Sequence, residues 1–302
     1  MAFRLITTAL AVALLSGCAK APEKPVPFAP AAPNTTPPAA VATPAIAADD
    51  NLNAVAWSQT AIEHDLIYLQ TYRDAEARLL PAMHNGKWDA LSKTDRVQAF
   101  KNLPPAVILD IDETVLDNSP YQARVIKSGG EFNEADWAAW CKETQARALP
   151  GAVEFTRFAA SHGIAVIYIS NRAKDLDQVT LLNLHKAGLP VSGPQAFLGL
   201  GTIVENCEQA GSEKGCRRQL VSRHYRVLMQ FGDQLGDFLD IPANTVAARR
   251  QIVEPYLPWI GTRWFVLPNP TYGSWEPALF NNDYSSPREL RRKQKLDALR
   301  YQ

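Results

Sequence analysis

The feature that most constrains this sequence is a short apolar run that ends abruptly in acidic residues. Residues 106–109, Ala-Val-Ile-Leu, are followed at 110–114 by Asp-Ile-Asp-Glu-Thr. An apolar run of this length is typical of a parallel strand that is covered on both faces. In open α/β sheets, ligands bind just beyond the carboxyl ends of such strands. Two carboxylates placed there repel each other and lose hydration, which indicates that a divalent cation offsets their charge.

The rest of the body alternates between apolar runs and segments with helical spacing. Further strands are predicted at 164–169, 197–198, 226–231 and 264–267, and helices at 52–80, 152–161, 176–187, 213–223 and 287–300. Another helix is predicted to begin after Asn133, a residue suited to cap it. This alternation predicts an α/β fold with a parallel sheet and helices on both faces.

The first 18 residues have the pattern of a targeting segment. Arg4 precedes the mostly apolar stretch 5–15, which has signal-peptide length and is too short to span a membrane. Residues 15–18, Leu-Ser-Gly-Cys, resemble the bacterial lipobox, which implies that Cys18 is lipid-modified. An ordinary signal peptide with an incidental cysteine is the alternative. Ala19 after the cysteine resembles sorting to the outer membrane, so we expect a lipid-anchored protein of the cell envelope.

Two further regions follow from composition. Residues 19–50 are rich in Ala and Pro, which predicts a disordered, semi-extended linker. Residues 51–302 are long enough for one α/β domain with insertions. Lys plus Arg and Asp plus Glu number 31 each, so bulk charge favours neither nucleic acid nor direct binding to an anionic membrane. Membrane contact is therefore expected through the lipid anchor only, and no oligomeric state is predicted.

Three cysteines lie in the body of the chain. Cys207 and Cys216 bracket a short polar loop, and an envelope location permits disulfides, so we expect them to pair. Closing this loop is worth about 2.5 kcal/mol in chain entropy. Two free thiols are the alternative, whereas no CxxC or matching His pair supports a zinc site. Cys141 is left without a partner and is expected to be buried.

Several polar residues lie at the ends of predicted strands or on the helices that face them: Asp110, Asp112, Ser170, Lys214, Asp233 and Asp237. Each has a use if the substrate is a phosphate ester. Asp110 can attack phosphorus, and Asp112 can protonate the leaving oxygen and then activate water. Asp110, Asp233 and a backbone carbonyl near Asp112 can supply oxygen ligands to Mg²⁺. Ser170 can donate to a phosphoryl oxygen, and Lys214 can neutralise its charge.

Four segments resemble the motifs of one known family. Residues 110–121, Asp-Ile-Asp-Glu-Thr-Val-Leu-Asp-Asn-Ser-Pro-Tyr, are similar to motif one of the haloacid dehalogenase (HAD) superfamily. The form is that of class C acid phosphatases, also called the lipoprotein e(P4) family of 5′-nucleotidases. Ser-Asn-Arg at 170–172 resembles motif two, Lys214 the motif-three lysine, and residues 232–238 motif four. The lipobox and the stretches 57–60 and 267–276 also resemble this family.

The resemblance implies a HAD-like, Rossmann-type fold with a small, mainly helical cap inserted at about 117–150. It implies Mg²⁺-dependent hydrolysis of phosphomonoesters, often nucleoside monophosphates. By motif match, Asp110 is the nucleophile and Asp112 the acid/base. The metal ligands would be Asp110, Asp112 through its backbone carbonyl, and Asp233, with Asp237 acting behind them or through a water.

Substrate contacts are expected from Asn171, Arg172, Tyr121 and Tyr272. Arg172 can either bind phosphate or pair with an acid, and both alternatives are open. Aromatic faces in the cap can stack on a nucleobase, but ordinary packing is favoured for Trp137 and Trp140. Two other functions compete with hydrolysis: phosphotransfer to a hydroxyl acceptor, and a non-catalytic, envelope-binding lipoprotein.

Overall fold

The computed structural model describes residues 49–302. The predicted signal peptide, the lipidation site Cys18 and nearly all of the linker expected at 19–50 lie outside the described residues. None of the helices within 49–302 combines the length and apolarity needed to cross a membrane.

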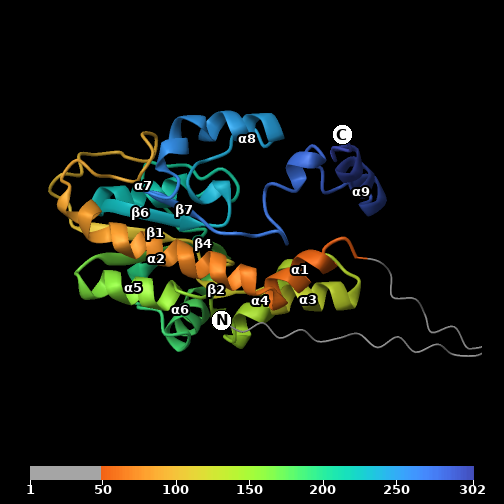
Figure 1. Cartoon of the computed structure of the whole chain (residues 1–302), viewed down its shortest axis with the longest axis horizontal. Helices are drawn as coiled ribbons and strands as arrows, with labels where there is room; N and C mark the ends of the chain where they lie inside the picture. Colours follow the sequence, from red (N-terminus) through yellow and green to blue (C-terminus); the bar gives the residue numbers. More distant parts are fainter. Residues whose placement is uncertain (1–48) are drawn as a thin grey trace, which may run out of the picture. The chain divides into compact units, whose positions relative to one another are not determined.

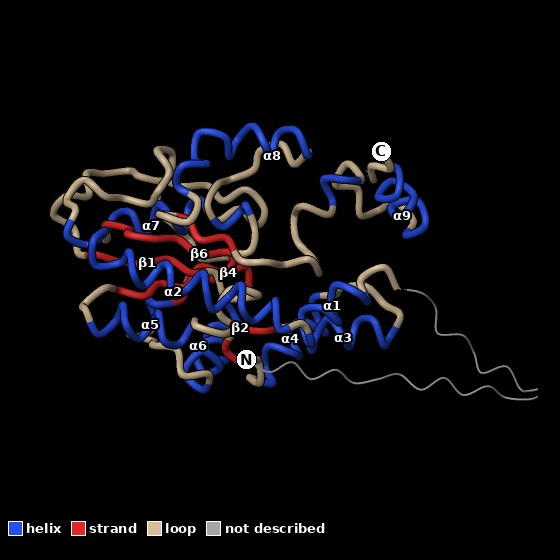
Figure 2. The backbone as a smooth tube through the Cα atoms, viewed as in Figure 1, coloured by secondary structure: helices blue, strands red, loops and turns tan. Residues whose placement is uncertain are grey.

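A five-stranded sheet forms the centre of the described residues (Figure 1). Its strands, in spatial order, are β5 (Phe197–Leu200), β4 (Ala165–Ala173), β1 (Pro105–Leu109), β6 (Arg226–Gly232) and β7 (Trp264–Val266). Every neighbouring pair is parallel. The predicted parallel sheet is therefore confirmed, and its carboxyl ends share one edge (Figure 2).

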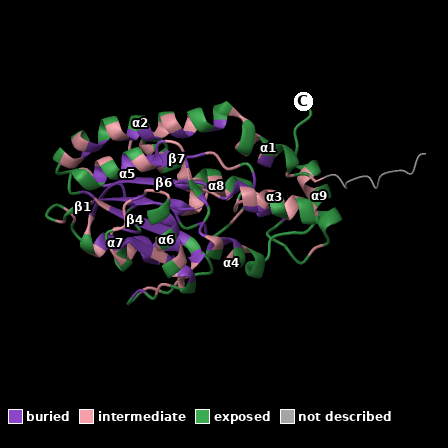
Figure 3. Ribbon diagram, turned by 90° about the horizontal axis from the view of Figure 1, so that it is seen from below, coloured by how far each residue is buried: buried purple, intermediate pink, exposed green. Residues whose placement is uncertain are grey.

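The two faces of the central strand β1 belong to different hydrophobic clusters. Val107 and Leu109 pack in a cluster with buried residues of helices α2, α5 and α6, whereas Ala106 and Ile108 pack in a second cluster that includes Val221 of helix α7. Both sheet faces are thus covered, which explains why the strand reads as an unbroken apolar run. Figure 3 shows the buried strands between more exposed helices.

The helices are α1 (Leu52–Thr60), α2 (Ile62–His84), α3 (Ser119–Ser128), α4 (Glu134–Glu143), α5 (Ala152–Ser161), α6 (Asp177–Lys186), α7 (Gly215–His224), α8 (Val246–Val253) and α9 (Arg288–Asp297). The single helix predicted at 52–80 is wrong, because the extended backbone of Ala61, with ψ 122°, divides it into α1 and α2. Apolar spacing continues through this break and so does not reveal it.

The segment between β1 and α5 is mainly helical. It contains α3 and α4, and it is closed by a short antiparallel pair, β2 (Leu116–Asp117) with β3 (Arg147–Ala148). Asn133 caps α4 by accepting a hydrogen bond from Asp136 N at 2.9 Å, as its sequence position suggests. Helices α3 and α8 were not predicted. A role for this segment as a cap over the site stays a prediction.

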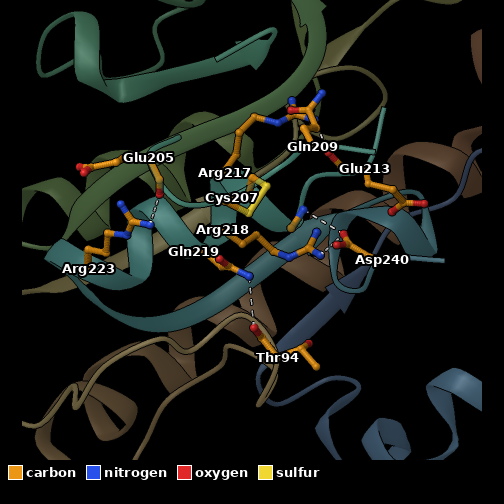
Figure 4. The surroundings of a disulfide bond; sticks show 12 residues. Thr94, Glu205, Cys207, Gln209, Glu213, Arg217, Arg218, Gln219, Arg223 and Asp240 are labelled. Carbon is orange, nitrogen blue, oxygen red and sulfur yellow. Dashed lines mark hydrogen bonds and ion pairs between the residues drawn. A yellow bond between two sulfur atoms is a disulfide. The ribbon is translucent and has the colours of Figure 1, made fainter. Parts of the chain in front are cut away.

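Cys207 and Cys216 form a disulfide bond with a Cα–Cα distance of 5.6 Å (Figure 4). Cys216 lies in the first turn of α7, so the bond ties that helix to the preceding loop. Cys141 is free and buried in the structure.

Removing this disulfide is expected to lower stability because the loop becomes free in the unfolded chain. The double variant Cys207→Ala/Cys216→Ala should lose about 2.5 kcal/mol in the free energy of unfolding, measured by urea denaturation under oxidising conditions. A reductant should produce the same loss in the wild type and no further loss in the variant. Equal stability of the oxidised wild type and the variant would contradict the expectation.

Candidate active site

The turn after β1 brings Asp110 to the carboxyl edge of the sheet. The Asp110 N–H donates to Phe231 O of β6 at 3.0 Å, which continues the pairing of the two strands by one residue. The backbone then folds back, because the N–H groups of Val115 and Leu116 both donate to Ile111 O at 2.9 Å. This tight turn holds Asp110 and the acids that follow it beside the end of β6.

Asp110, Asp233 and Asp237 form a cluster of carboxylates at this edge. One carboxylate oxygen from each lies within 4.8 Å of the others. Asp233 directly follows β6, and Asp237 ends the short 3-10 helix Leu235–Asp237. Because β1 and β6 are parallel neighbours, their ends bring together acids that are more than a hundred residues apart in the sequence.

Lys214, at the start of α7, extends its side chain into this cluster. It precedes α7, and its Nζ donates to Asp110 Oδ1 at 2.5 Å, to Asp237 Oδ1 at 2.7 Å and to Ile169 O at 2.9 Å. Burial favours the neutral amine, but the two carboxylates outweigh it and raise the pKa of Lys214. The ammonium is thus held charged between two acids.

The acids themselves carry an excess of negative charge. Burial raises the pKa of Asp110 well above its usual range; Lys214 opposes this rise, whereas Asp237 and Asp233 add to it. Burial likewise raises the pKa of Asp233 to about 6, against hydrogen bonds from Asn269 Nδ2 at 2.9 Å and Gln234 Nε2 at 2.7 Å. A further positive charge nearby would therefore stabilise the ionised form of both carboxylates.

The charges and donors of this cluster fit a divalent cation. Three carboxylates and one ammonium leave a formal charge of minus two. Oxygen ligands suit Mg²⁺, and Asp110 and Asp233 are placed to supply them. Both Asp237 oxygens are already hydrogen-bonded, Oδ1 to Lys214 and Oδ2 to Gln234 N at 2.8 Å. This arrangement favours an indirect role for Asp237, through a water or through its neighbours.

Asp112 belongs to a second hydrogen-bond network, formed with residues of β4 and with Asn118. Its Oδ1 accepts from Arg172 Nε at 2.9 Å and from Asn118 Nδ2 at 2.8 Å, and its Oδ2 accepts from Ser170 Oγ at 3.1 Å. Arg172 Nη2 also lies 2.8 Å from Oδ1. Strand β4 continues to Ala173, four residues past the predicted end, and in doing so places Ser170 and Arg172 on the face toward Asp112.

In this structure Arg172 makes one of the two contacts left open for it, the pairing with an acid. Its guanidinium pairs with Asp112, and its side chain is completely buried; a contact with substrate phosphate stays a prediction. Ser170 is also buried, and its hydroxyl donates to Asp112 Oδ2 at 3.1 Å. The two residues thus hold the expected acid/base in place.

The remaining predicted substrate contacts differ in their surroundings. Tyr121 is buried, and its ring meets Trp137 edge-on at 5.1 Å between centroids, so it packs within the helical segment. Tyr272 is partly exposed, and its hydroxyl donates to the Glu113 carboxylate. Asn171 is exposed and lies near the end of β4, between Ser170 and Arg172.

Sequence reasoning missed several residues that support these groups. Glu113 is buried, with a pKa raised well above its usual range by burial, and its carboxylate also accepts from Asn118 N at 2.8 Å. Trp140, for which the sequence favoured ordinary packing, also donates to Asn118 Oδ1 at 2.7 Å, a contact that the sequence did not indicate. Asn269 fixes Asp233. Only the resemblance of 267–276 to a known family pointed toward Asn269, and it named no partner.

Loss of Lys214 is expected to leave buried acids without their cation. In EDTA at pH 7, Lys214→Met should lower the free energy of unfolding by about 3–5 kcal/mol. The deficit should shrink at pH 5, because the raised pKa values of Asp110 and Asp233 let protons replace the missing charge in the folded state.

Arg78→Met is a suitable control, because Arg78 pairs with Asp74 on an exposed helix surface and should contribute less than about 1 kcal/mol. Denaturation curves of both variants at the two pH values provide the measurement. A deficit for Lys214→Met no larger than that of the control would contradict this electrostatic account.

The chain is similar to proteins of known structure. It aligns with a structure described as the class C acid phosphatase from Bacillus anthracis with tungstate bound, with 32% identity and a TM-score of 0.73, over 83% of this chain and 97% of that one. A second structure of the Bacillus anthracis class C acid phosphatase matches with the same identity and a TM-score of 0.72.

Plant proteins are also related. They include a Stem 31 kDa glycoprotein of Glycine max (29% identity, 55% of this chain and 58% of the relative) and Vegetative storage protein 1 of Arabidopsis thaliana (29%, covering 55% and 54%). Acid phosphatase 1 of Solanum lycopersicum is 25% identical, over 55% of this chain and 57% of its own. The chain thus spans little more than half the length of these three relatives.

Residues 45–275 match the family model described as HAD superfamily, subfamily IIIB (Acid phosphatase). The match covers most of the chain and contains every residue of the acid cluster and of the Asp112 network. It agrees with the parallel sheet and with the placement of the acids at its carboxyl edge. The chain therefore belongs to subfamily IIIB, the acid phosphatases, of the HAD superfamily.

Proposed function

We propose that this protein is a Mg²⁺-dependent phosphomonoesterase that acts through an aspartyl-phosphate. The observation that carries the proposal is the Asp110 carboxylate. Among the described residues, its one side-chain hydrogen-bond donor is Lys214, which binds Oδ1, so Oδ2 is left for attack on phosphorus. Family membership points to the same class of reaction.

In the first step, Asp110 Oδ2 attacks phosphorus and the ester oxygen departs. Lys214 keeps the nucleophile ionised and offsets the negative charge of the transferring phosphoryl group. When bound beside Asp110 and Asp233, Mg²⁺ supplies Lewis-acid stabilisation of that charge. The surrounding burial makes each of these interactions stronger than it would be in water.

Asp112 is the proposed acid/base of both steps. It protonates the leaving oxygen as the aspartyl-phosphate forms, and its carboxylate then takes a proton from the water that attacks phosphorus. Ser170, Arg172 and Asn118 fix its position two residues from the nucleophile. In this role Arg172 and Ser170 orient the Asp112 carboxylate and do not themselves bind the substrate.

For the substrate we propose a small phosphomonoester, with nucleoside monophosphates preferred. Tyr272 supports this choice, because its ring is partly exposed and its hydroxyl is anchored on Glu113. An anchored aromatic face can stack on a base, worth about 1–3 kcal/mol. Phosphate release from a panel of nucleotides and sugar phosphates tests this preference directly.

Two other functions compete with hydrolysis: a non-catalytic, envelope-binding role and phosphotransfer to a hydroxyl acceptor. Some relatives are named storage proteins, so membership of the family does not by itself select catalysis; the presence of both Asp110 and Asp112, with Lys214, favours it. Phosphotransfer uses the same intermediate with an acceptor hydroxyl in place of water, and product analysis with added nucleoside distinguishes phosphotransfer from hydrolysis.

We also propose that Cys18 anchors the protein to the cell envelope. Incorporation of a labelled lipid into the wild type, but not into Cys18→Ser, would test this proposal.

Asp110→Asn is expected to abolish turnover while the protein remains folded. The substitution removes the nucleophilic oxygen but nearly preserves the shape of the side chain, so kcat for a chromogenic phosphate ester should fall roughly ten-thousand-fold or more. Circular dichroism should be unchanged, and Asp74→Asn, an exposed acid on α2, should retain full activity. Substantial turnover by the Asp110 variant would refute its role as nucleophile.

Chelation is expected to inactivate the protein, and Mg²⁺ should restore it. Asn269→Ala should raise the Mg²⁺ concentration for half-maximal activity roughly tenfold or more, because Asn269 orients the Asp233 carboxylate. Thermal stabilisation by Mg²⁺ should shift in parallel, which reports binding independently of activity. If EDTA leaves phosphate release unchanged, the metal part of the proposal fails.

A further inference from the structure

Arg217 is a completely buried cation one helical turn beyond Lys214, and the proposed mechanism does not use it. Its guanidinium donates to Ser170 O at 2.6 Å, and to Ser212 O at 3.2 Å and Glu213 O at 3.0 Å. The next residue, Arg218, is also buried but pairs with Asp95 and Asp240, each at 2.8 Å. Figure 4 shows that the two side chains leave α7 in different directions, Arg218 toward Asp240.

Arg217 has no such carboxylate partner among the described residues. Burial lowers the pKa of Arg217 to about 10, and the largest opposing influence is the charge of Asp110. The guanidinium therefore lies close enough to the acid cluster to be affected by the nucleophile. Burying a cation without an ion pair is costly, so its position needs a reason beyond packing.

The fourth contact of Arg217 supplies that reason. Its Nη2 donates to Asn171 Oδ1 at 2.8 Å. A guanidinium can only donate, so the contact requires that the Asn171 oxygen, and not its amide nitrogen, faces Arg217. The Nδ2 group must then point the other way, where it makes no hydrogen bond within residues 49–302. Asn171 is exposed and directly follows Ser170 at the end of β4.

The fixed amide therefore presents N–H donors at the edge of the sheet where the phosphoryl group is proposed to bind. We infer that Arg217 is a positioning residue that holds the Asn171 amide with its N–H donors toward the phosphoryl oxygens of the substrate. The inference rests on the proposed function for the identity of the ligand. It assigns Arg217 a part in binding through Asn171, without any contact of its own with phosphate.

Asn171→Asp separates this role from a purely structural one. The aspartate keeps an oxygen acceptor for Arg217 and adds an ion pair, so the melting temperature should equal or exceed that of the wild type. The outward N–H donors are replaced by a carboxylate oxygen that repels phosphate. KM for a chromogenic phosphate ester should rise at least tenfold, and the inhibition constant of inorganic phosphate should rise by a similar factor.

Asn171→Ala supplies the second arm, because it removes both the outward donors and the Arg217 contact. We expect KM to rise less than in Asn171→Asp, since no repulsive charge is added, whereas the melting temperature should fall below that of the wild type. Asn53→Asp, the same substitution at an exposed position on α1, should change neither quantity. An oriented donor therefore predicts that Asn171→Asp has the higher KM of the two variants and Asn171→Ala the lower melting temperature.

The outcomes are distinct. Asn171→Asp with wild-type KM and phosphate inhibition would overturn the inference, as would Asn171→Ala with the larger loss of affinity. If Asn171→Asp fails to fold, Arg217→Lys provides the test: the proposal expects a higher KM with little change in kcat, and an unchanged KM would overturn it. If the wild type hydrolyses no phosphate ester, the proposed function fails, but calorimetric binding of inorganic phosphate by the same variants still tests Asn171.

Discussion

The contact on which the site depends is the one between Lys214 and its two carboxylates, Asp110 and Asp237. Without the ammonium, three buried acids would meet at the end of the sheet with no ion-pair partner among the described residues. With it, a formal charge of minus two remains, which one divalent cation would balance. The sheet provides the framework for this arrangement, because parallel order places the acids at one edge, and α7 brings the lysine to them from across that edge.

A second principle is that charged groups are held by other charged or polar groups, and few of them are free. Asp112 is restrained by Arg172, Ser170 and Asn118, and Asp233 by Asn269 and Gln234. In the proposed mechanism, such restraint fixes these carboxylates before substrate arrives, which reduces the reorganisation that the reaction must accomplish. It also explains why so many large polar side chains are buried close to the sheet edge.

Much of the fold could be predicted from the sequence, because buried parallel strands have a strong local signature. The run that became β1 is apolar throughout and the run that became β6 is mostly apolar, and an aspartate follows each, so both the strands and the acids beyond them were evident. The break at Ala61 was not, since it leaves apolar spacing intact. The partners of Ser170 and Arg172 depend on how far β4 extends and on which face it presents, and neither follows from residue types alone. Likewise, nothing in the neighbourhood of Arg217 announced that it would bond Asn171.

The disulfide has a consequence for how the site comes together. Cys207 and Cys216 enclose the segment that carries Lys214, so the ammonium belongs to a small covalent ring. Closing that ring reduces the number of conformations open to Lys214. The binding of Lys214 to Asp110 and Asp237 in turn brings the two sulfur atoms close together. Each event favours the other by the same free energy. Formation of the disulfide and binding of Lys214 to its two carboxylates are therefore one coupled equilibrium.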